Sequence, residues 1–308
     1  MSYQKCLVLG ANGFVGSYLV EALANKSELS VIAFDRFSTP PQFEELSNIK
    51  VLKGDIFEDS QLREALQGVD TVMHSFSATT PFVSDQDPYK DITDNLQRSV
   101  RLFELCAQAG VKKIGFISSA GTVYGSVTEV KTASEDDAPL PVSPYGINKL
   151  SIEHYLEYFK KRNGLDYTVF RLTNPYGPRQ LTKNNQGVVP AFINKIKNNE
   201  ELTIYGDGTS SRDYIYMRDA ARMIVRGFLS ERNDHSIYNI GSGVQTTLGD
   251  IVESLSRIAK KRPQIAYKEA PKTFLLHSSV SIERFIQEFG EPHLTSLDDG
   301  LRETFITS

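Results

Sequence analysis

The first half of the chain alternates short apolar runs with amphipathic stretches of helical periodicity. The apolar runs are typical of buried parallel strands and cover 5–10, 29–35, 49–55, 69–75, 111–119 and 165–172. Helices are predicted between several of these runs, over 59–68, 95–110 and 145–164. Gly110 is a natural stop for the second helix. Strands that alternate with helices predict an α/β fold, a Rossmann-type doubly wound parallel sheet.

After Arg171 the pattern becomes less regular, with a long polar loop followed by shorter helices and strands. We therefore expect two domains. Residues 1–173 would form a dinucleotide-binding domain to which 212–241 return. Residues 174–211 and 242–308 would form a smaller, mixed substrate-binding domain.

The composition of the 308 residues is that of a soluble globular protein, with 40% hydrophobic and 23% charged residues. A net charge of -4 indicates no surface for nucleic acid or an anionic membrane. No apolar run approaches the roughly 18 residues of a membrane span, and the N-terminal segment is too short for a signal peptide. The expected location is the cytoplasm. Cys6 and Cys106 lie in apolar segments, which favours reduced thiols and no metal site.

Three glycines separate the first predicted strand from the first helix. In "GANGFVG" they are Gly10, Gly13 and Gly16, with the spacing GxxGxxG. Small residues allow a tight turn there, and the N-terminus of the following helix can face a pyrophosphate. The predicted cofactor turn comprises Gly10, Asn12, Gly13, Phe14, Val15 and Gly16.

Acidic residues end the next two strands. Asp35 can accept hydrogen bonds from both ribose hydroxyls, and its charge would repel a 2′-phosphate, which favours NAD over NADP. Arg36 beside it could partly reverse that preference. Asp55 could bind the adenine amine, or it could be an ordinary turn aspartate. Ile56 and Ser75 complete the predicted cofactor site.

Tyr145 and Lys149 in "SPYGINK" are spaced i, i+4, so a helix places them on the same face. A cation beside a phenol favours the phenolate, and a group whose usual pKa is about 10 could then act as a base near neutral pH. By itself, this short motif fits a half-buried tyrosine beside a solvated lysine better than a catalytic pair, because short motifs match by chance.

Several motifs occur in order along the chain: "GANGFVG", "ISSAGTVYG", "SPYGINK", "RLTNPYGPRQ", "YGDGTSSRDYIYMRDAA" and "YNIGSG". With them the chain resembles an extended short-chain dehydrogenase/reductase of the NAD-dependent epimerase/dehydratase family, and within it the UDP-glucose 4-epimerases most. The resemblance runs from about residue 5 to residue 243. It implies a tightly held NAD that is reduced and reoxidised in one turnover. Tyr145 would take the proton of the sugar C4 hydroxyl, and Lys149 would lower the Tyr145 pKa and bind the nicotinamide ribose.

One position departs from the family pattern. Family members commonly carry a Ser or Thr where this chain has Ala120, and that hydroxyl binds the C4 oxygen. Thr122 is the nearest replacement and Ser119 the second, although Thr122 could be a packing residue and Ser119 could cap the strand end. The same segment lacks the Asp-Glu pair of sugar 4,6-dehydratases, which argues against a dehydratase.

The resemblance also implies a set of substrate-binding residues: Asn95, Thr122, Asn174, Arg179, Val188 and Arg212. Asn95 could equally be a plain amide on a helix surface. Arg212 would bind the nucleotide diphosphate, or else pair internally with Asp213 or Asp219. Lys272 is the candidate replacement for an arginine that relatives use near the nucleotide. His74 is expected to be a buried histidine with its hydrogen bonds satisfied.

The resulting prediction is a nucleotide-sugar 4-epimerase that acts on a UDP-hexose or a UDP-N-acetylhexosamine through a 4-keto intermediate. One alternative is a nucleotide-sugar 4-ketoreductase, for example on a dTDP-4-keto-6-deoxy sugar, which consumes NAD(P)H. A second is a non-catalytic NAD(H)-sensing protein, against which the intact Tyr145 and Lys149 argue. The resemblance suggests a homodimer through the helices that contain 100–106 and 149–159.

Overall fold

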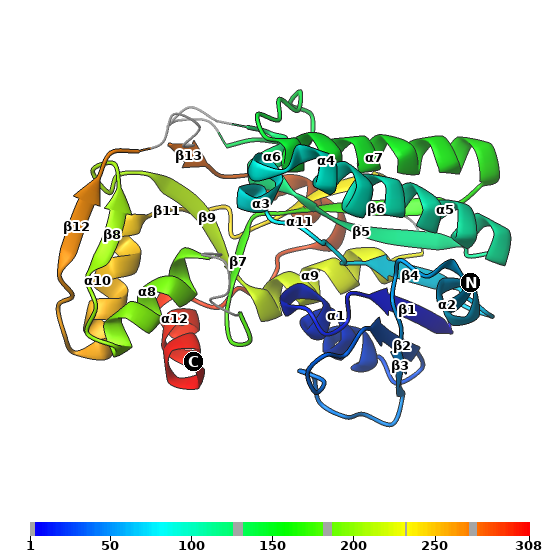
Figure 1. The fold of residues 1–308 in the computed structure, drawn as a ribbon, viewed down its shortest axis with the longest axis horizontal. Coiled ribbons are helices and arrows are strands. Elements are labelled where there is room, and N and C mark those ends of the chain that lie inside the picture. The colour runs from blue at the N-terminus through cyan, green and yellow to red at the C-terminus, as the bar shows by residue number, and fades with distance from the viewer. Residues whose placement is uncertain (1–3, 126–131, 181–186, 232, 271–275) are drawn as a thin grey trace.

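A seven-stranded parallel sheet forms the centre of the larger part of the molecule (Figure 1). The computed structural model describes residues 4–125, 132–180, 187–231, 233–270 and 276–308. The strands lie in the order β10-β6-β5-β4-β1-β2-β3. Their bounds are β1 Lys5–Leu9, β2 Ser30–Asp35, β3 Ile49–Lys53, β4 Thr71–His74, β5 Lys113–Ser119, β6 Asp166–Leu172 and β10 Ile237–Ile240. The predicted Rossmann-type fold and its first six strands are confirmed.

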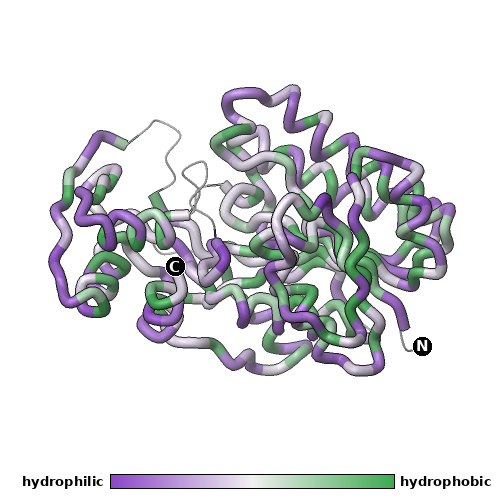
Figure 2. Tube along the Cα trace, turned by 60° about the horizontal axis from the view of Figure 1, so that its bottom comes forward, coloured by the Kyte–Doolittle hydropathy of each residue, from purple (hydrophilic) through white to green (hydrophobic). Residues whose placement is uncertain are grey.

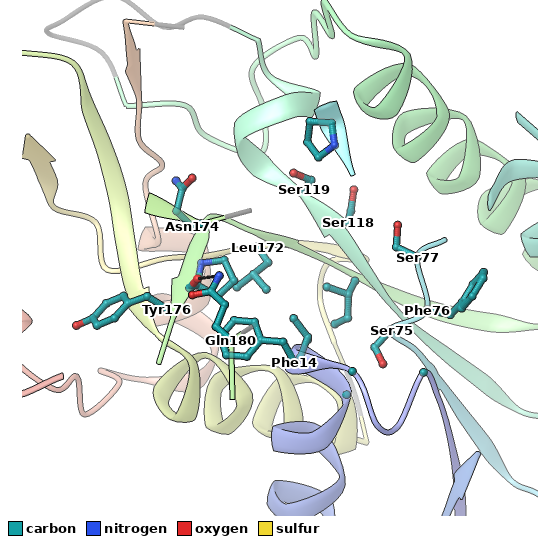
Figure 3. Close-up of a pocket in the computed structure, with 18 of the residues that line it drawn as sticks. Phe14, Ser75, Phe76, Ser77, Ser118, Ser119, Leu172, Asn174, Tyr176 and Gln180 are labelled. Atoms are coloured by element: carbon teal, nitrogen blue, oxygen red, sulfur yellow. Dashed lines mark hydrogen bonds between the residues drawn. The ribbon is translucent and has the colours of Figure 1, made fainter. Parts of the chain in front are cut away.

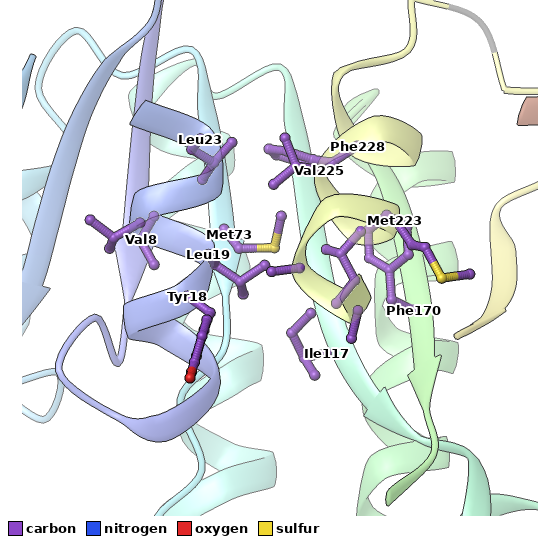
Figure 4. Packing of buried hydrophobic residues seen from close by; sticks show 14 of the residues in the cluster. Val8, Tyr18, Leu19, Leu23, Met73, Ile117, Phe170, Met223, Val225 and Phe228 are labelled. Atoms are coloured by element: carbon purple, nitrogen blue, oxygen red, sulfur yellow. The ribbon is translucent and has the colours of Figure 1, made fainter. Parts of the chain in front are cut away.

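Helices cover both faces of this sheet, and each face has its own apolar core. On one face α1 (Phe14–Ala24) and α9 (Met217–Leu229) pack together, with α11 (Glu283–Phe289) beside them. Figure 4 shows Leu19 and Leu23 of α1 on the side of α9, with Leu23 opposite Val225 and Phe228 and with Met73 between the two helices. The other face carries α2 (Asp59–Ala65), α5 (Arg98–Ala109) and α7 (Pro144–Asn163).

The predicted helix over 95–110 begins earlier than expected. The helical region starts with α3 (Pro81–Gln86) and α4 (Pro88–Asp91) and continues as a π-helical segment η1 (Ile92–Gln97) into α5. Proline at the first helical position suits a helix start, and Pro81 and Pro88 both lie there. The stop is as predicted, because Gly110 has a left-handed φ of 77° that glycine adopts without strain.

A smaller, mixed part lies beside the large sheet, at the left of Figure 1. Its four-stranded sheet contains β7 (Asn174–Tyr176), β9 (Ser211–Tyr216), β11 (Gln245–Thr247) and β13 (His277–Ser278), and a two-stranded sheet pairs β8 (Leu202–Tyr205) with β12 (Ile265–Lys268). Helices α8 (Val188–Lys197), α10 (Leu248–Ala259) and α12 (Leu297–Thr307) supply its core. Figure 2 shows hydrophobic segments inside both parts and hydrophilic ones mostly outside.

The chain crosses between the two parts more than once. β9 lies in the small sheet, whereas α9 and β10 lie against or in the large one. Helix α11, from the last stretch of the chain, packs on the large part. The expected division assigned most of β9 to the large domain and α11 to the small one, and in the structure each packs with the other part. The domain boundaries themselves stay a prediction.

Candidate functional site

A deep cavity opens at the carboxyl ends of the central strands, between the two parts of the molecule (Figure 3). Its volume is about 830 Å³. β1 is flanked by β4 on one side and β2 on the other, so successive connections leave the sheet in opposite directions there. Ligands of doubly wound sheets bind in the crevice at such a switch point. Figure 3 shows Ser118 and Ser119 on one side of this cavity and Phe14 and Ser75 toward α1.

The glycine turn after β1 forms one wall of the cavity. Gly10 has a φ of 76°, and a Cβ on Gly16 would lie 1.9 Å from the Gly10 carbonyl oxygen. The turn after β1 and helix α1 can therefore approach this closely only because residue 16 has no side chain. Helix α1 begins at Phe14 after the cap residue Gly13, so no capping side chain covers its first N–H groups. Such a helix start favours an anion like a pyrophosphate.

The carboxylate of Asp35 lies at the end of β2 and in the cavity wall. It accepts hydrogen bonds from the backbone N–H of Asn12 at 3.0 Å and of Arg36 at 2.7 Å. The Asn12 side chain in turn donates to the carbonyl oxygen of Thr39 at 3.0 Å. The glycine turn and the strand-end acid are thus joined directly, and this arrangement fits NAD.

The remaining predicted cofactor residues also line the cavity: Phe14, Val15, Arg36, Asp55, Ile56 and Ser75. One carboxylate oxygen of Asp55 accepts from the backbone N–H of Phe57 at 3.0 Å, so Asp55 also stabilises the turn after β3. The Ser75 hydroxyl donates to the Leu9 carbonyl oxygen at 2.7 Å and packs beside Gly16. Their contacts with a cofactor stay a prediction.

Tyr145 and Lys149 lie on the first turns of α7 and both line the cavity. Pro144 and the cap residue Ser143, which accepts from the Gly146 N–H at 3.2 Å, start the helix at this position. The buried Lys149 Nζ donates to the Ile117 carbonyl oxygen at 2.9 Å. It lies 5.5 Å from the centre of the Tyr145 ring. The ammonium is therefore anchored on β5 and held beside the phenol.

The two candidate hydroxyls lie at the end of β5 and in the short helix α6 (Ala120–Val123). The Thr122 hydroxyl points back toward the Ser119 carbonyl oxygen at 3.4 Å, and both residues line the cavity. Ala120 is buried in a small apolar cluster instead. The choice between Thr122 and Ser119 stays a prediction.

Three residues predicted to bind the substrate also line the cavity, namely Asn174, Val188 and Arg212, and their contacts with a substrate stay a prediction. The Asn174 amide donates to the Asp213 carbonyl oxygen at 3.0 Å, which joins β7 to β9. The Arg212 guanidinium donates to the carbonyl oxygens of Ser211 at 2.8 Å and Leu276 at 3.0 Å. Burial lowers the pKa of Arg212, since a charge loses hydration there. An anionic ligand would compensate that loss.

The internal ion pairs considered for Arg212 can be compared with the structure. The Asp213 carboxylate accepts from the backbone N–H of Ser242 at 2.7 Å and of Gly243 at 3.1 Å. Asp219 forms an ion pair with Arg222. Both carboxylates thus have other partners.

Arg179 lines the cavity, but its guanidinium faces α1. It forms an ion pair with Glu21 at 2.7 Å and lies 4.5 Å from the centre of the Tyr18 ring. The Tyr18 hydroxyl donates to the Pro178 carbonyl oxygen at 2.9 Å. These contacts fasten the loop after β7 to the cofactor-side helix, a role that the sequence prediction lacked.

Among the predicted site residues that the structure describes, Asn95 alone lies away from the cavity wall. It lies in η1, 6% exposed, and its amide donates to Asp91 at 2.6 Å and to Thr79 at 2.7 Å. Its oxygen accepts from the backbone N–H of Ala78 at 2.8 Å. Because these bonds hold the loop after β4, the amide is already occupied inside the protein, and it is not a plain surface amide either.

His74 is buried, as expected, and its Nε2 lies 2.9 Å from the Ser99 hydroxyl. Burial, and secondarily the charge of Lys149, lowers the pKa of His74 to about 3, so the imidazole is neutral. Its Nδ1 has no hydrogen-bond partner, so only one of the two ring nitrogens is satisfied. Lys272 lies outside the described residues.

Within the described ranges, no group of three or more His, Cys, Asp or Glu side chains could hold a metal ion. In the same part of the chain, every helix is too short or too polar to cross a membrane.

The sequence prediction missed Ser118, Thr173 and Gln180, which also line the cavity. Ser118 and Thr173 each lie beside a residue that was predicted, so adjacency was a usable signal. Gln180 follows Arg179 on the loop, and its Oε1 is buried without a hydrogen-bond partner. No spacing rule points to it.

Comparisons with known proteins agree with this geometry. The sequence model described as "NAD dependent epimerase/dehydratase family" matches residues 6–241. A dTDP-4-dehydro-6-deoxyglucose reductase of Escherichia coli is 33% identical, over 96% of this chain and 94% of its own. A UDP-glucose 4-epimerase of Thermotoga maritima, solved with UDP-glucose, has a TM-score of 0.90 at 32% identity, over 99% and 98% of the two chains. A UDP-N-acetylglucosamine 4-epimerase of Methanobrevibacter ruminantium has a TM-score of 0.89 at 30% identity, over 100% and 98%.

Proposed function

The chain belongs to the NAD-dependent epimerase/dehydratase family, and from this premise we propose that it is a nucleotide-sugar 4-epimerase. It is an enzyme and its cofactor is NAD. We propose a UDP-hexose or a UDP-N-acetylhexosamine as the substrate, because the two proteins with similar structures are named as a UDP-glucose and a UDP-N-acetylglucosamine 4-epimerase. One observation carries the proposal. Tyr145 and Lys149 lie side by side on the wall of the cavity that also contains the glycine turn and Asp35.

The bound NAD supplies the chemistry of accepting a hydride from C4 of the sugar and returning it. Gly10, Gly13 and Gly16 would hold its pyrophosphate at the start of α1, and Asp35 its adenosine ribose. These residues fit the cofactor because the turn leaves no space for a Cβ at Gly16 and ends in uncapped N–H groups.

The protein moves the proton of the reaction. Tyr145 takes it from the C4 hydroxyl as the sugar becomes a 4-keto intermediate and returns it afterwards, which is general base and then general acid catalysis. Lys149, fixed on the Ile117 carbonyl, holds its positive charge beside the phenol. Thr122, or else Ser119, holds the C4 oxygen at the phenol. The cavity would leave the ketone room to turn so that its other face lies toward the cofactor turn.

Arg212 would bind the diphosphate of the substrate. Its guanidinium lies in the cavity wall and is anchored by two carbonyl oxygens, and a planar guanidinium suits phosphate oxygens. The protein would act as a homodimer through α5 and α7. Tyr155 and Tyr158 of α7 are 41% and 45% exposed in the single chain, and a second subunit would cover them. Sedimentation equilibrium of the purified protein tests the dimer, and a monomer at micromolar concentration would contradict it.

A 4-ketoreductase is the second candidate, since the Escherichia coli relative at 33% identity bears the name of a reductase. The same phenol, ammonium and turn would serve it. Cofactor behaviour separates the two functions. An epimerase purifies with NAD and needs none added, whereas a reductase consumes one NAD(P)H for each product.

The test uses the purified protein with a panel of UDP-, dTDP-, GDP- and CDP-sugars, with and without NADH, and identifies the products by NMR. We expect a C4-inverted UDP-sugar without added cofactor. Product that forms only in proportion to added NAD(P)H would overturn the epimerase in favour of the reductase. NAD binding without any product would favour the NAD(H)-sensing alternative.

A further inference from the structure

A third side chain continues the catalytic face of α7. Tyr145, Lys149 and Glu153 are spaced by four residues, so they follow one another along one side of the helix. Glu153 is 5% exposed, about as deeply buried as Lys149 at 6%. A carboxylate so far from water needs partners that offset its lost hydration.

Two strands supply those partners. From β6, Arg171 donates through Nε to both carboxylate oxygens of Glu153 at 3.2 Å and through Nη2 to one of them at 2.7 Å. From β5, the hydroxyl of the cavity residue Ser118 donates to Glu153 at 2.5 Å. Helix α7 is therefore attached to β5 at successive turns, by Lys149 on the Ile117 carbonyl and by Glu153 on Ser118.

The other end of the Arg171 guanidinium holds the segment that carries the candidate hydroxyl. Its Nη1 donates to the Tyr124 hydroxyl at 2.8 Å, and the guanidinium carbon lies 4.8 Å from the centre of the Tyr124 ring. Tyr124 directly follows α6, the four-residue helix that contains Thr122. The Tyr124 hydroxyl in turn donates a hydrogen bond to the Asn239 side-chain oxygen at 2.8 Å, which fixes Tyr124 on β10.

The network then reaches chain segments that are remote in sequence. The Asn239 amide donates to the carbonyl oxygens of Ala133 and Ser281, each at 3.1 Å. Ala133 forms a bridge with Val280, two residues after the cavity residue Ser278. Through these hydrogen bonds, the buried Glu153–Arg171 ion pair is connected to α7, to the end of α6 and to the chain segment just after the cavity residue Ser278.

We propose that the Glu153–Arg171 ion pair is a positioning device for the reaction. It holds the face of α7 that presents Tyr145 and Lys149, and the short helix that presents Thr122, in one fixed arrangement against β5. The inference rests on the proposed function. A purely structural pair could be replaced by apolar side chains at little cost, as buried ion pairs often can be. A positioning pair cannot, because small displacements of reacting groups are costly to the rate.

The test compares Glu153→Gln and Arg171→Lys with the wild-type holoenzyme. Arg171→Lys keeps the charge but loses the planar fork that reaches Glu153 and Tyr124 together. The control is Lys113→Met, because Lys113 is also buried on β5 but donates to the Phe228 carbonyl oxygen at 2.9 Å, outside the site. All rates are measured well below the melting temperature of each variant.

We expect Glu153→Gln to lower kcat by about 10- to 100-fold and to change KM by less than about threefold. Arg171→Lys should keep a melting temperature close to that of the wild type but should still lose much of kcat. Lys113→Met should lose stability with kcat within about twofold of the wild type. If kcat of the two site variants stays near wild type while they are folded, or falls only as the melting temperature falls, the positioning role is wrong.

Amide hydrogen exchange gives a readout that needs no substrate. In Glu153→Gln, exchange should become faster at 120–124 and in the first turns of α7, whereas Lys113→Met should leave these segments unchanged. Faster exchange spread evenly over the protein in both variants would overturn the proposal. A wild-type protein that converts no sugar of the panel would refute the proposed function, and the exchange result would still decide on the ion pair. If Glu153→Gln does not fold, Glu153→Asp keeps the charge, shortens the reach and carries the same expectations.

Discussion

The two halves of the cavity are built in different ways. On the cofactor side, the glycine turn and the strand-end acids follow one another along the chain and are joined by local bonds, such as that from the Asn12 N–H to Asp35 at 3.0 Å. On the substrate side, Asn174, Val188 and Arg212 come from three separate elements, β7, α8 and β9. The cofactor half depends on backbone shape, whereas the substrate half depends on how distant segments are packed. Mutations in the cofactor half should therefore change the affinity for NAD and the stability of the protein. Mutations in the substrate half should mainly change turnover or KM.

The largest effect is expected at Tyr145, which lies where the two halves meet. Tyr145→Phe should lower turnover by about 10²–10⁴-fold, the usual contribution of a general acid–base group, and leave NAD bound. The measurement is kcat of the variant together with the NAD content of the purified protein. Near wild-type turnover would remove Tyr145 from the mechanism, and loss of NAD would make it a cofactor residue instead.

Two glycines of the same turn give a matched pair for the cofactor half. A Cβ at Gly16 would meet the Gly10 carbonyl oxygen at 1.9 Å, while one at Gly13 would lie 3.2 Å from it. Overpacking of this kind typically costs about 1–3 kcal/mol. We expect Gly16→Ala to weaken NAD binding by about 10- to 100-fold and to lower the melting temperature of the apo protein. Gly13→Ala should leave that temperature nearly unchanged, and equal losses in the two variants would contradict the close approach as the cause.

This contrast also explains what the sequence could and could not predict. The strands and the glycine turn are local patterns, so their positions followed from periodicity and from the special conformations that glycine allows. The π-helical η1 and the inward-turned Asn95 did not follow. Asp91 is only four residues before Asn95, but the other partner of the amide, Thr79, belongs to the loop after β4, and only the folded chain brings it close. Arg179 was predicted from a motif, but its pairing with Glu21 joins residues far apart in sequence. Glu153 carried a signal in its spacing from Lys149, although its partner Arg171 did not.

Thr122→Val tests the candidate hydroxyl in α6 and should have an intermediate effect. A neutral hydrogen bond contributes roughly 0.5–1.5 kcal/mol net, and more when charge builds on the oxygen, so kcat should fall by about tenfold or somewhat more. Valine keeps the branched shape and therefore separates the hydroxyl from the packing. Ser119→Ala is the matched control. Full activity in Thr122→Val with loss in Ser119→Ala would mean that Ser119 holds the C4 oxygen.

Asp35→Ala should narrow the preference for NAD over NADP, and this effect should be smaller than the loss of kcat in Thr122→Val. Two unit charges about 4 Å apart in water interact by about 1 kcal/mol, which corresponds to roughly a fivefold change in relative affinity. Titration of the apo protein with both dinucleotides measures it. Arg36 is exposed beside Asp35, and tighter binding of NADP than of NAD by the wild type would mean that Arg36 outweighs the carboxylate.

The smallest effect is expected at Arg179, and it decides to which half this residue belongs. Its ion pair with Glu21 connects a loop of the substrate side with helix α1 of the cofactor side, and the two side chains are 24% and 21% exposed. Ion pairs near the surface contribute about 0.2–1 kcal/mol, so Arg179→Ala and Glu21→Gln should each speed NAD release by about two- to fivefold. Stopped-flow displacement of NAD gives these rates. If Arg179 instead binds the nucleotide sugar, Arg179→Ala would raise KM while Glu21→Gln would leave it unchanged. The pair of variants thus separates a fastening between the two halves from a contact with the substrate, because only the fastening requires both partners.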